Sequence, residues 1–343
     1  MRHNSISSRL AAVAALVFLA TASTQAQSVE EFYRGKIVSL YIGFSVGGGY
    51  DTYGRLIARH LGNHIPGNPV VVPLNMEGAG SVKLANWLYN AAPKDGTVIA
   101  TVNRGVPFEP LTGNRDAVRF DPTEFTWIGS ANEEASVCVA WKRTGIARFE
   151  DLYERELIVG ATGPGADDFV FPRLVRGVLG VNIRIVSGYA GGNDIDFASE
   201  RGEVDGRCGW SWSSVVSTRQ AWLANDSISI LLQLGLRKHP DLPDVPLIMD
   251  LAETEEDRQI LRLVLARLVL GRPFVAPPGI PEDRAAALRQ AFDDTMKDPA
   301  FLADAERSRL EITPITGAEL EELLGDLYET PPHLVERAWQ MLR

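Results

Sequence analysis

Short apolar segments rich in β-branched residues alternate along this chain with segments whose apolar positions recur every three or four residues. The first apolar segment, residues 37–44, is followed by three glycines at 47–49 and then by a helical pattern that starts near Tyr50. Short apolar runs favour buried strands, whereas the longer spacing favours helices. With Asp51 as the expected N-cap, the pattern predicts a strand, a glycine turn and a helix.

The same order of strand, small-residue turn and helix recurs in both halves, which predicts an α/β protein made of two facing units. Each unit is expected to hold a mostly parallel sheet flanked by helices, with a cleft between the units. Residues 127–141 are interpreted as one strand that leaves the first unit. The other strands are predicted at residues 69–74, 97–102, 157–161, 183–187, 204–208 and 228–236.

The turns after these strands are suited to binding an anion. Glycine has no Cβ, so a ligand can approach the backbone closely, and the unpaired N–H groups of a helix start favour negative charge. Ligands of parallel α/β sheets bind beyond the carboxyl ends of the strands, where this chain places turns at 47–49, 78–81 and 103–104. The first turn offers no nucleophile or general base, so it is interpreted as a binding site.

The first 26 residues have the order of a secretory signal. Arg2 and Arg9 form a basic region, residues 10–20 are apolar, and residues 24–26 are a small-residue cleavage site. The apolar run is too short to span a bilayer. Removing the two arginines takes the formal net charge from −10 to −10 − 2 = −12, which argues against nucleic acid and anionic membranes as partners. The mature protein is expected to be periplasmic, without direct membrane insertion.

Cysteine and histidine usage leaves two questions open. Cys138 and Cys208 are expected in an oxidising compartment, so a disulfide and two buried free thiols are both possible. His60 and His64 stand four residues apart, a spacing that suits a metal ion on a helix. Because Gly62 lies between them and a third ligand is not nearby in the sequence, exposed histidines without a metal are favoured.

The sequence motifs do not favour an enzymatic function. Gly43, Gly47 and Gly49 lack the spacing of a dinucleotide-binding turn, and the chain has no His-Glu-x-x-His motif. We therefore expect a protein that is not an enzyme and that uses no cofactor and no metal. A secreted enzyme of unknown reaction is the weaker alternative.

Several short motifs occur together in a characteristic order. They are Val46-Gly47-Gly48-Gly49-Tyr50-Asp51, Gly78-Ala79-Gly80, Pro93-Lys94-Asp95-Gly96-Thr97, Tyr189-Ala190-Gly191-Gly192, Gly202-Glu203-Val204-Asp205, Leu-Pro-Asp-Val-Pro at 242–246 and Ala-Pro-Pro-Gly-Ile-Pro at 276–281. In this order and spacing, over nearly the whole mature chain, the sequence resembles the Bug family, the periplasmic receptors of tripartite tricarboxylate transporters.

This resemblance implies a two-domain, type II-like periplasmic binding protein that captures a small carboxylate and delivers it to membrane transporter subunits. Domain 1 is expected at 27–131, domain 2 at 132–245 and the return to domain 1 at 246–343, in a monomer. Presentation of the bound ligand to a sensor kinase is the alternative output. The extra Trp and Tyr residues favour a bulkier ligand.

The resemblance also implies that the first two glycine turns hold the carboxylate through backbone amides and water, while domain 2 adds polar groups. Because Arg104 follows a strand end, a carboxylate contact is favoured for it over a surface arginine that pairs with Glu109 or Asp116. Arg207 is either a ligand contact or part of a structural ion pair. Tyr189 and Trp210 either line the pocket or belong to the core. The expected ligand-binding residues are Ser45, Val46, Gly47, Gly48, Gly49, Gly78, Ala79, Gly80, Ser81, Asn103, Arg104, Thr162, Gly163, Gly165, Tyr189, Gly192, Asp194, Arg207 and Trp210.

Overall fold

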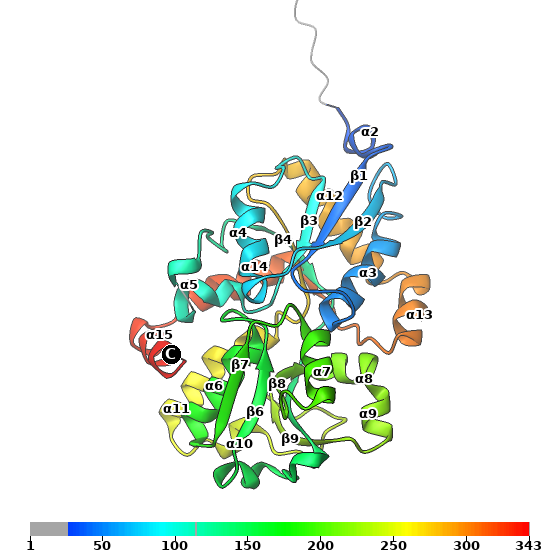
Figure 1. The fold of residues 1–343 in the computed structure, drawn as a ribbon. Helices are drawn as coiled ribbons and strands as arrows, with labels where there is room; N and C mark the ends of the chain where they lie inside the picture. Colours follow the sequence, from blue (N-terminus) through cyan, green and yellow to red (C-terminus); the bar gives the residue numbers. More distant parts are fainter. Residues whose placement is uncertain (1–26, 114, 343) are drawn as a thin grey trace, which may run out of the picture.

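The computed structural model describes residues 27–113 and 115–342, so the predicted signal segment 1–26 lies outside the described residues. The described chain forms two lobes, each built on one sheet (Figure 1). The first lobe holds β1 (Ile37–Ile42), β2 (Val70–Asn75), β3 (Val98–Thr101), β4 (Thr126–Ser130), β10 (Pro273–Ala276) and β11 (Ile315–Thr316). The second lobe holds β5 (Ser136–Trp141), β6 (Leu157–Ala161), β7 (Ile183–Ser187), β8 (Gly206–Ser211) and β9 (Ile228–Leu234).

Each sheet has a parallel core and antiparallel strands beside it. In the first lobe, β1 pairs in parallel with β2 and β3, and β10 pairs antiparallel with β3 and β4. In the second lobe, β6 pairs in parallel with β7 and β8, and β5 pairs antiparallel with β8 and β9. The two-lobed α/β fold is confirmed, but the sheets are mixed rather than mostly parallel.

The chain crosses between the lobes where the sequence pattern predicts a single long strand. Residues 127–141 are not one strand, because they contribute to β4 in the first sheet and to β5 in the second. After the second lobe, α10 (Ile248–Leu251) still packs on β9, and the chain re-enters the first sheet at β10. Both crossings meet at the hinge, where the backbone N–H of Glu134 donates to the carbonyl of Leu268 at 3.0 Å.

Helices cover both sheets because they present buried apolar positions to them. In α3, for example, Tyr53, Leu56, Ile57 and Leu61 are buried in one apolar cluster. The helices of the first lobe are α2 (Val29–Tyr33), α3 (Gly49–Leu61), α4 (Val82–Asn90), α5 (Glu109–Thr112), α12 (Glu282–Thr295), α13 (Pro299–Arg307) and α14 (Gly317–Tyr328). Those of the second lobe are α6 (Asp167–Leu179), α7 (Gly192–Arg201), α8 (Trp212–Thr218), α9 (Gln220–Ala224), α10 and α11 (Glu255–Leu265).

The last helix joins the two lobes. Helix α15 (Pro332–Met341) packs against α5 of the first lobe and against α6 and α11 of the second. Figure 1 shows it beside the junction of the lobes. Within the part of the chain that the structure describes, no helix combines the length and apolar character needed to cross a membrane.

Cys138 and Cys208 form a disulfide between neighbouring strands of the second sheet. Both residues are fully buried, and they lie opposite one another in the antiparallel pair of β5 and β8. The structure therefore decides the cysteine question in favour of the disulfide. Since Arg207 and Trp210 also lie on β8, the crosslink fixes the strand that carries them.

Candidate functional site

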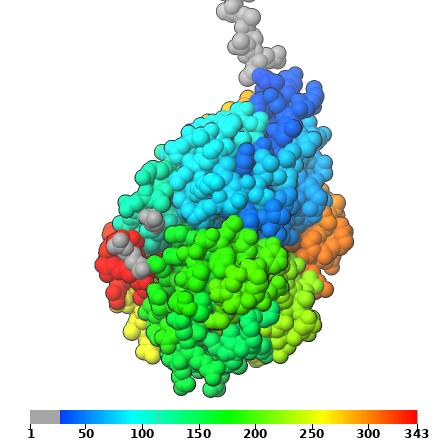
Figure 2. Space-filling view, viewed as in Figure 1, coloured from blue at the N-terminus to red at the C-terminus, as the bar shows by residue number. Residues whose placement is uncertain are grey.

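A cavity lies between the two lobes, at the carboxyl ends of the parallel strands. Turns from both sheets line it, and about 40 Å³ of it is open to water-sized molecules, roughly three of them. Figure 2 shows the two lobes in contact along the face that is viewed. The lining residues are Phe44, Gly48, Gly49, Tyr50, Asn103, Ala166, Asp167, Asp168, Gly192, Arg207, Gly209, Trp210, Ser211, Ser214 and Arg272.

The start of α3 forms one wall of the cavity. Gly48 is the N-cap and Gly49 the first helical residue, so the unpaired N–H groups of the first turn lie at the cavity. A Cβ on Gly49 would lie 1.9 Å from Ser214 Oγ, so the approach of the second lobe requires glycine at this position. The expected N-cap, Asp51, is instead the third helical residue, and its carboxylate accepts the Gly47 N–H at 3.0 Å.

Arg272 reaches the cavity from the second crossing between the lobes. Its guanidinium lies over the ring of Tyr50, 4.4 Å from the centroid. Nη2 donates to Ser214 Oγ at 2.8 Å and lies 3.0 Å from Glu134 Oε1. Among the described residues Nε has no hydrogen-bond partner, although the side chain is almost fully buried. Arg272 therefore lines the cavity with a guanidinium group whose buried Nε–H is unpaired within the described chain.

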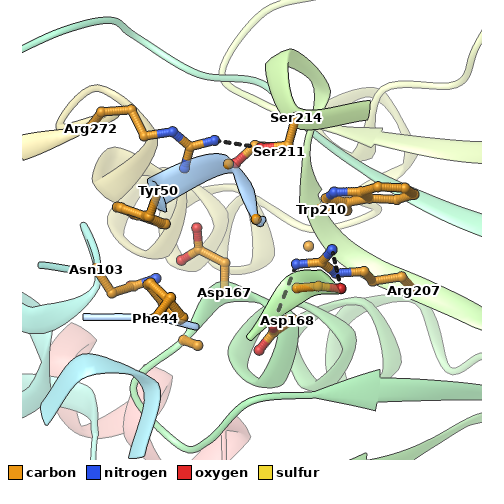
Figure 3. Close-up of a pocket in the computed structure, with 15 residues that line it drawn as sticks. Phe44, Tyr50, Asn103, Asp167, Asp168, Arg207, Trp210, Ser211, Ser214 and Arg272 are labelled. Atoms are coloured by element: carbon orange, nitrogen blue, oxygen red, sulfur yellow. Dashed lines mark hydrogen bonds and ion pairs between the residues drawn. The ribbon is translucent and has the colours of Figure 1, made fainter. Parts of the chain in front are cut away.

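The second lobe contributes a matching arginine, Arg207 on β8. Its guanidinium lies 4.9 Å from the ring centroid of Trp210 (Figure 3). Its Nη1 lies 3.3 Å from Asp196 Oδ1. Nε again has no partner within the described part of the chain. Gly192, the first residue of α7, lies beside it and brings a second helix start to the cavity.

Two carboxylates at the start of α6 also line the cavity. Asp167 Oδ2 accepts from Arg104 Nε at 2.5 Å, and Oδ1 lies 3.6 Å from Arg267 Nη1. Asp168 Oδ1 accepts from the backbone N–H and the hydroxyl of Thr162, at 3.0 and 2.9 Å. Burial raises the pKa of Asp168 from 3.8 to about 6, although the nearby Arg207 opposes the shift.

The expected site residues fall into four groups. Gly48, Gly49, Asn103, Gly192, Arg207 and Trp210 line the cavity. A second group lies at the contact between the lobes, where Ser45 Oγ donates to Asp194 Oδ2 at 2.6 Å and Gly80 faces Gly163. This group comprises Ser45, Gly47, Ala79, Gly80, Arg104, Gly163, Gly165 and Asp194. Ser81 lies against Gly43 within the first lobe, and Thr162 donates to Asp168 within the second.

The remaining three expected residues lie away from the cavity. The side chain of Val46 is 59% exposed, and Gly78 lies beside Lys83. Tyr189 is half-buried and packs near Gly160. These three residues do not line the cavity, and their expected ligand contacts stay predictions.

Several residues of the cavity are not among the expected ligand-binding residues. Asp167 and Asp168 follow a glycine turn directly, but carboxylates are not expected beside an anion. Arg272 stands between the apolar residues 268–270 and 273–276. A single charge within such an apolar run is the feature of the sequence that points to a functional arginine. The residues of the cavity missed in this way are Phe44, Tyr50, Ala166, Asp167, Asp168, Gly209, Ser211, Ser214 and Arg272.

Residues 43–47 read Gly-Phe-Ser-Val-Gly, the spacing of a nucleophile turn in α/β-hydrolases. In the structure the hydroxyl of Ser45 donates to Asp194, while His60 and His64 contact Asp304 and Asp298.

The expected exposure of the two histidines is wrong, since both are largely buried against these carboxylates. Within residues 27–113 and 115–342, no cluster of three metal-ligating side chains is found.

Comparison with solved structures places this fold among known ones. The periplasmic binding protein BugD superposes with a TM-score of 0.73 at 18% identity, over 89% of this chain and 98% of that one. MatC (Rpa3494) from Rhodopseudomonas palustris with bound malate gives 0.69 at 19% identity, over 90% and 99%. Rpa4515 from R. palustris with adipate gives 0.69 at 18% identity, over 90% and 97%.

The chain has the periplasmic-binding-protein fold. No family model matches its sequence, and a search of curated proteins finds no match either. In this periplasmic-binding-protein fold, the cavity described above lies between the lobes, where the turns of both sheets meet.

Proposed function

We propose that this protein is a periplasmic solute receptor of the Bug family that binds a small carboxylate between its lobes. The observation that carries the proposal is the convergence of two helix starts, those of α3 and α7, with Arg207 and Arg272 in one cavity. Helix starts and arginine forks are complementary to a carboxylate. The same fold holds malate in MatC and adipate in Rpa4515, which supports a carboxylate as the ligand.

The carboxylate would be held from both lobes at once. The backbone of Gly48 and Gly49 and the side chain of Asn103 belong to the first lobe, whereas Arg207 and Trp210 belong to the second. A ligand that contacts both walls favours the closed arrangement over an open one, because its affinity for the two states differs. We assign these five residues to ligand contact and the turns around Gly80 and Gly163 to closure.

The closed form would be the state that a membrane partner recognises. We propose delivery of the ligand to the membrane subunits of a tripartite tricarboxylate transporter, with the protein acting as a monomer and not as an enzyme. This output follows from the shared fold and the motif order of the Bug family. A sensor kinase that reads the same closed form is the alternative partner, and co-purification with each type of membrane protein distinguishes the two.

Calorimetric titration of the mature protein with a panel of carboxylates tests the binding step. One carboxylate should bind, and Arg207→Gln should weaken its binding about 10- to 100-fold, as expected for a hydrogen bond to a charged group. Arg184→Gln is the matched control, because Arg184 is about half exposed and pairs with Glu156 on the surface. Equal affinities in the wild type and Arg207→Gln, or binding of a neutral sugar instead of any carboxylate, would contradict the proposal.

A further inference from the structure

The charges of the cavity are already balanced before a ligand enters. Two of its lining side chains are arginines, Arg207 and Arg272, and two are carboxylates, Asp167 and Asp168. Arg272 faces Glu134 at 3.0 Å behind the wall, and Arg207 faces Asp196 at 3.3 Å. Asp196 is shared with Arg219, whose Nη2 lies 3.0 Å from Oδ2, and both arginines of the cavity thus already face a carboxylate of the protein.

Asp167 is likewise committed to the protein. Arg104 and Arg267 flank its carboxylate, and all three side chains are almost fully buried. Arg104, which the sequence suggests as a carboxylate binder, therefore pairs through Nε with a carboxylate of the second lobe and does not line the cavity. A ligand has to use the other donors of the cavity.

The positive potential that remains comes from the helix starts. Helices α3 and α7 point their first turns at the cavity, and each contributes a partial charge of about +0.5. Their sum is about one elementary charge. The guanidinium groups of Arg207 and Arg272, which line the cavity, add N–H donors. This combination matches one carboxylate, whereas a second carboxylate would enter a site whose arginines are already neutralised.

Asp168 offers a hydrogen-bond acceptor to the ligand, whereas the helix starts and arginines offer donors. Thr162 donates twice to its Oδ1, while Oδ2 lies 3.8 Å from Arg207 Nη2, beyond hydrogen-bond length. Figure 3 shows Asp168 below Arg207 at the edge of the cavity. A carboxylate oxygen in this position accepts a hydrogen bond, and an acceptor in a buried site selects ligands that carry a donor.

We propose that the ligand is a small monocarboxylate that also carries a hydrogen-bond donor, a hydroxyl or an ammonium group, directed at Asp168. This inference rests on the proposed carboxylate receptor and deepens it. The helix starts with Arg207 and Arg272 bind the carboxylate, and Asp168 Oδ2 accepts from the donor group. A plain dicarboxylate of the same length is discriminated against, because its second carboxylate faces Asp168.

Calorimetry with matched ligands tests this selectivity. The three-carbon set is propanoate, lactate, alanine and malonate, and the four-carbon set is butanoate, 2-hydroxybutanoate, 2-aminobutanoate and succinate. In at least one set the hydroxy or amino acid should bind about 10- to 100-fold more tightly than the unsubstituted acid and the dicarboxylate. The better of the two substituted acids shows whether the donor is a hydroxyl or an ammonium group.

The variant Asp168→Asn then tests the assigned residue. Its amide oxygen can still accept from Thr162, but an NH₂ group replaces the acceptor Oδ2. The affinity for the substituted acid should fall about 10- to 100-fold, and the dicarboxylate should bind more tightly than in the wild type. Asp226→Asn is the matched control, since Asp226 is exposed and pairs with Lys142. Because the change reverses the order of the ligands, a merely misfolded variant cannot reproduce it.

Two results would overturn the inference in different ways. If a dicarboxylate or an unsubstituted acid binds as tightly as its substituted counterpart, the carboxylate receptor stands and the role of Asp168 is rejected. If no carboxylate of either set binds and a neutral solute does, both proposals fail. If Asp168→Asn binds nothing because it is unfolded, its circular dichroism spectrum will show this. In that case Asp168→Glu becomes the test, because it keeps the acceptor and should retain the wild-type order of ligands.

Discussion

The two lobes meet at a backbone contact that a single methyl group should disturb. The turn at Gly163 in the second lobe packs on the turn at Gly80 in the first. A Cβ on Gly163 would lie 2.8 Å from Gly80 N and 2.9 Å from the carbonyl carbon of Ala79, distances that side chains do not tolerate. Both atoms are backbone, so neither can rotate away. The φ angle of Gly163 lies outside the left-handed region, so alanine strains neither its own turn nor its own lobe.

The Gly163→Ala substitution should therefore act on the closed arrangement and leave each lobe intact. Overpacking by one methyl group typically costs about 1 to 3 kcal/mol. Applied to the closed state alone, this corresponds to a shift of about 5- to 150-fold in the ratio of closed to open molecules. Ligand affinity should fall by up to the same factor, because the ligand has to supply the lost closure energy.

Two measurements check this expectation. Small-angle X-ray scattering of the ligand-free protein should give a larger radius of gyration for Gly163→Ala than for the wild type, and calorimetry should show weaker binding of the ligand. Gly325→Ala is the control, because no described atom lies within 4 Å of the added methyl group in α14. A Gly163→Ala protein with the wild-type radius of gyration and the wild-type affinity would refute the argument that these turns meet during closure.

Three further substitutions test the buried charges and the disulfide. Because the folded state raises the pKa of Asp168 from 3.8 to about 6, it binds the proton more tightly than the unfolded chain. The free energy of unfolding of the wild type should therefore decrease, relative to Asp168→Asn, by about 2 kcal/mol between pH 4 and pH 7, and the same pH dependence of both proteins in urea titrations would contradict this. Replacing Cys138 and Cys208 by alanine opens a crosslink between residues 70 apart in sequence and should cost about 4 kcal/mol on the chain-entropy model, measured by denaturant unfolding. Glu134→Gln leaves the buried Arg272 without its counter-ion at 3.0 Å and should lower the free energy of unfolding by about 3 to 5 kcal/mol, whereas an unchanged melting curve would exclude this pairing.

Local patterns in the sequence are sufficient for the elements and for their order. The apolar run at 37–44 and the glycines at 47–49 predict β1 and the start of α3, and both lie where expected. Strands of the second lobe, such as β6 and β7, coincide with their predicted segments. Such patterns are local because a strand or a helix is specified by the spacing of its own apolar residues.

The single strand predicted at 127–141 shows the limit of local patterns. Its two halves have the same apolar character, yet β4 and β5 belong to different sheets. The choice of sheet depends on β10 and β9, the strands that pair with them from distant parts of the chain. Spacing alone carries no information on such partners.

The chain by itself thus determined a two-lobed α/β protein with glycine turns at its strand ends, because these features depend on neighbouring residues. Only the tertiary structure decided which turns enclose the cavity and which turns touch each other, as Gly48 and Gly80 illustrate. It also decided that Arg104 pairs with Asp167 and that Arg272 enters the cavity. A buried charge requires a counter-ion. The counter-ions of these residues are distant in sequence and come near only when the chain folds, so the sequence alone does not show the pairs.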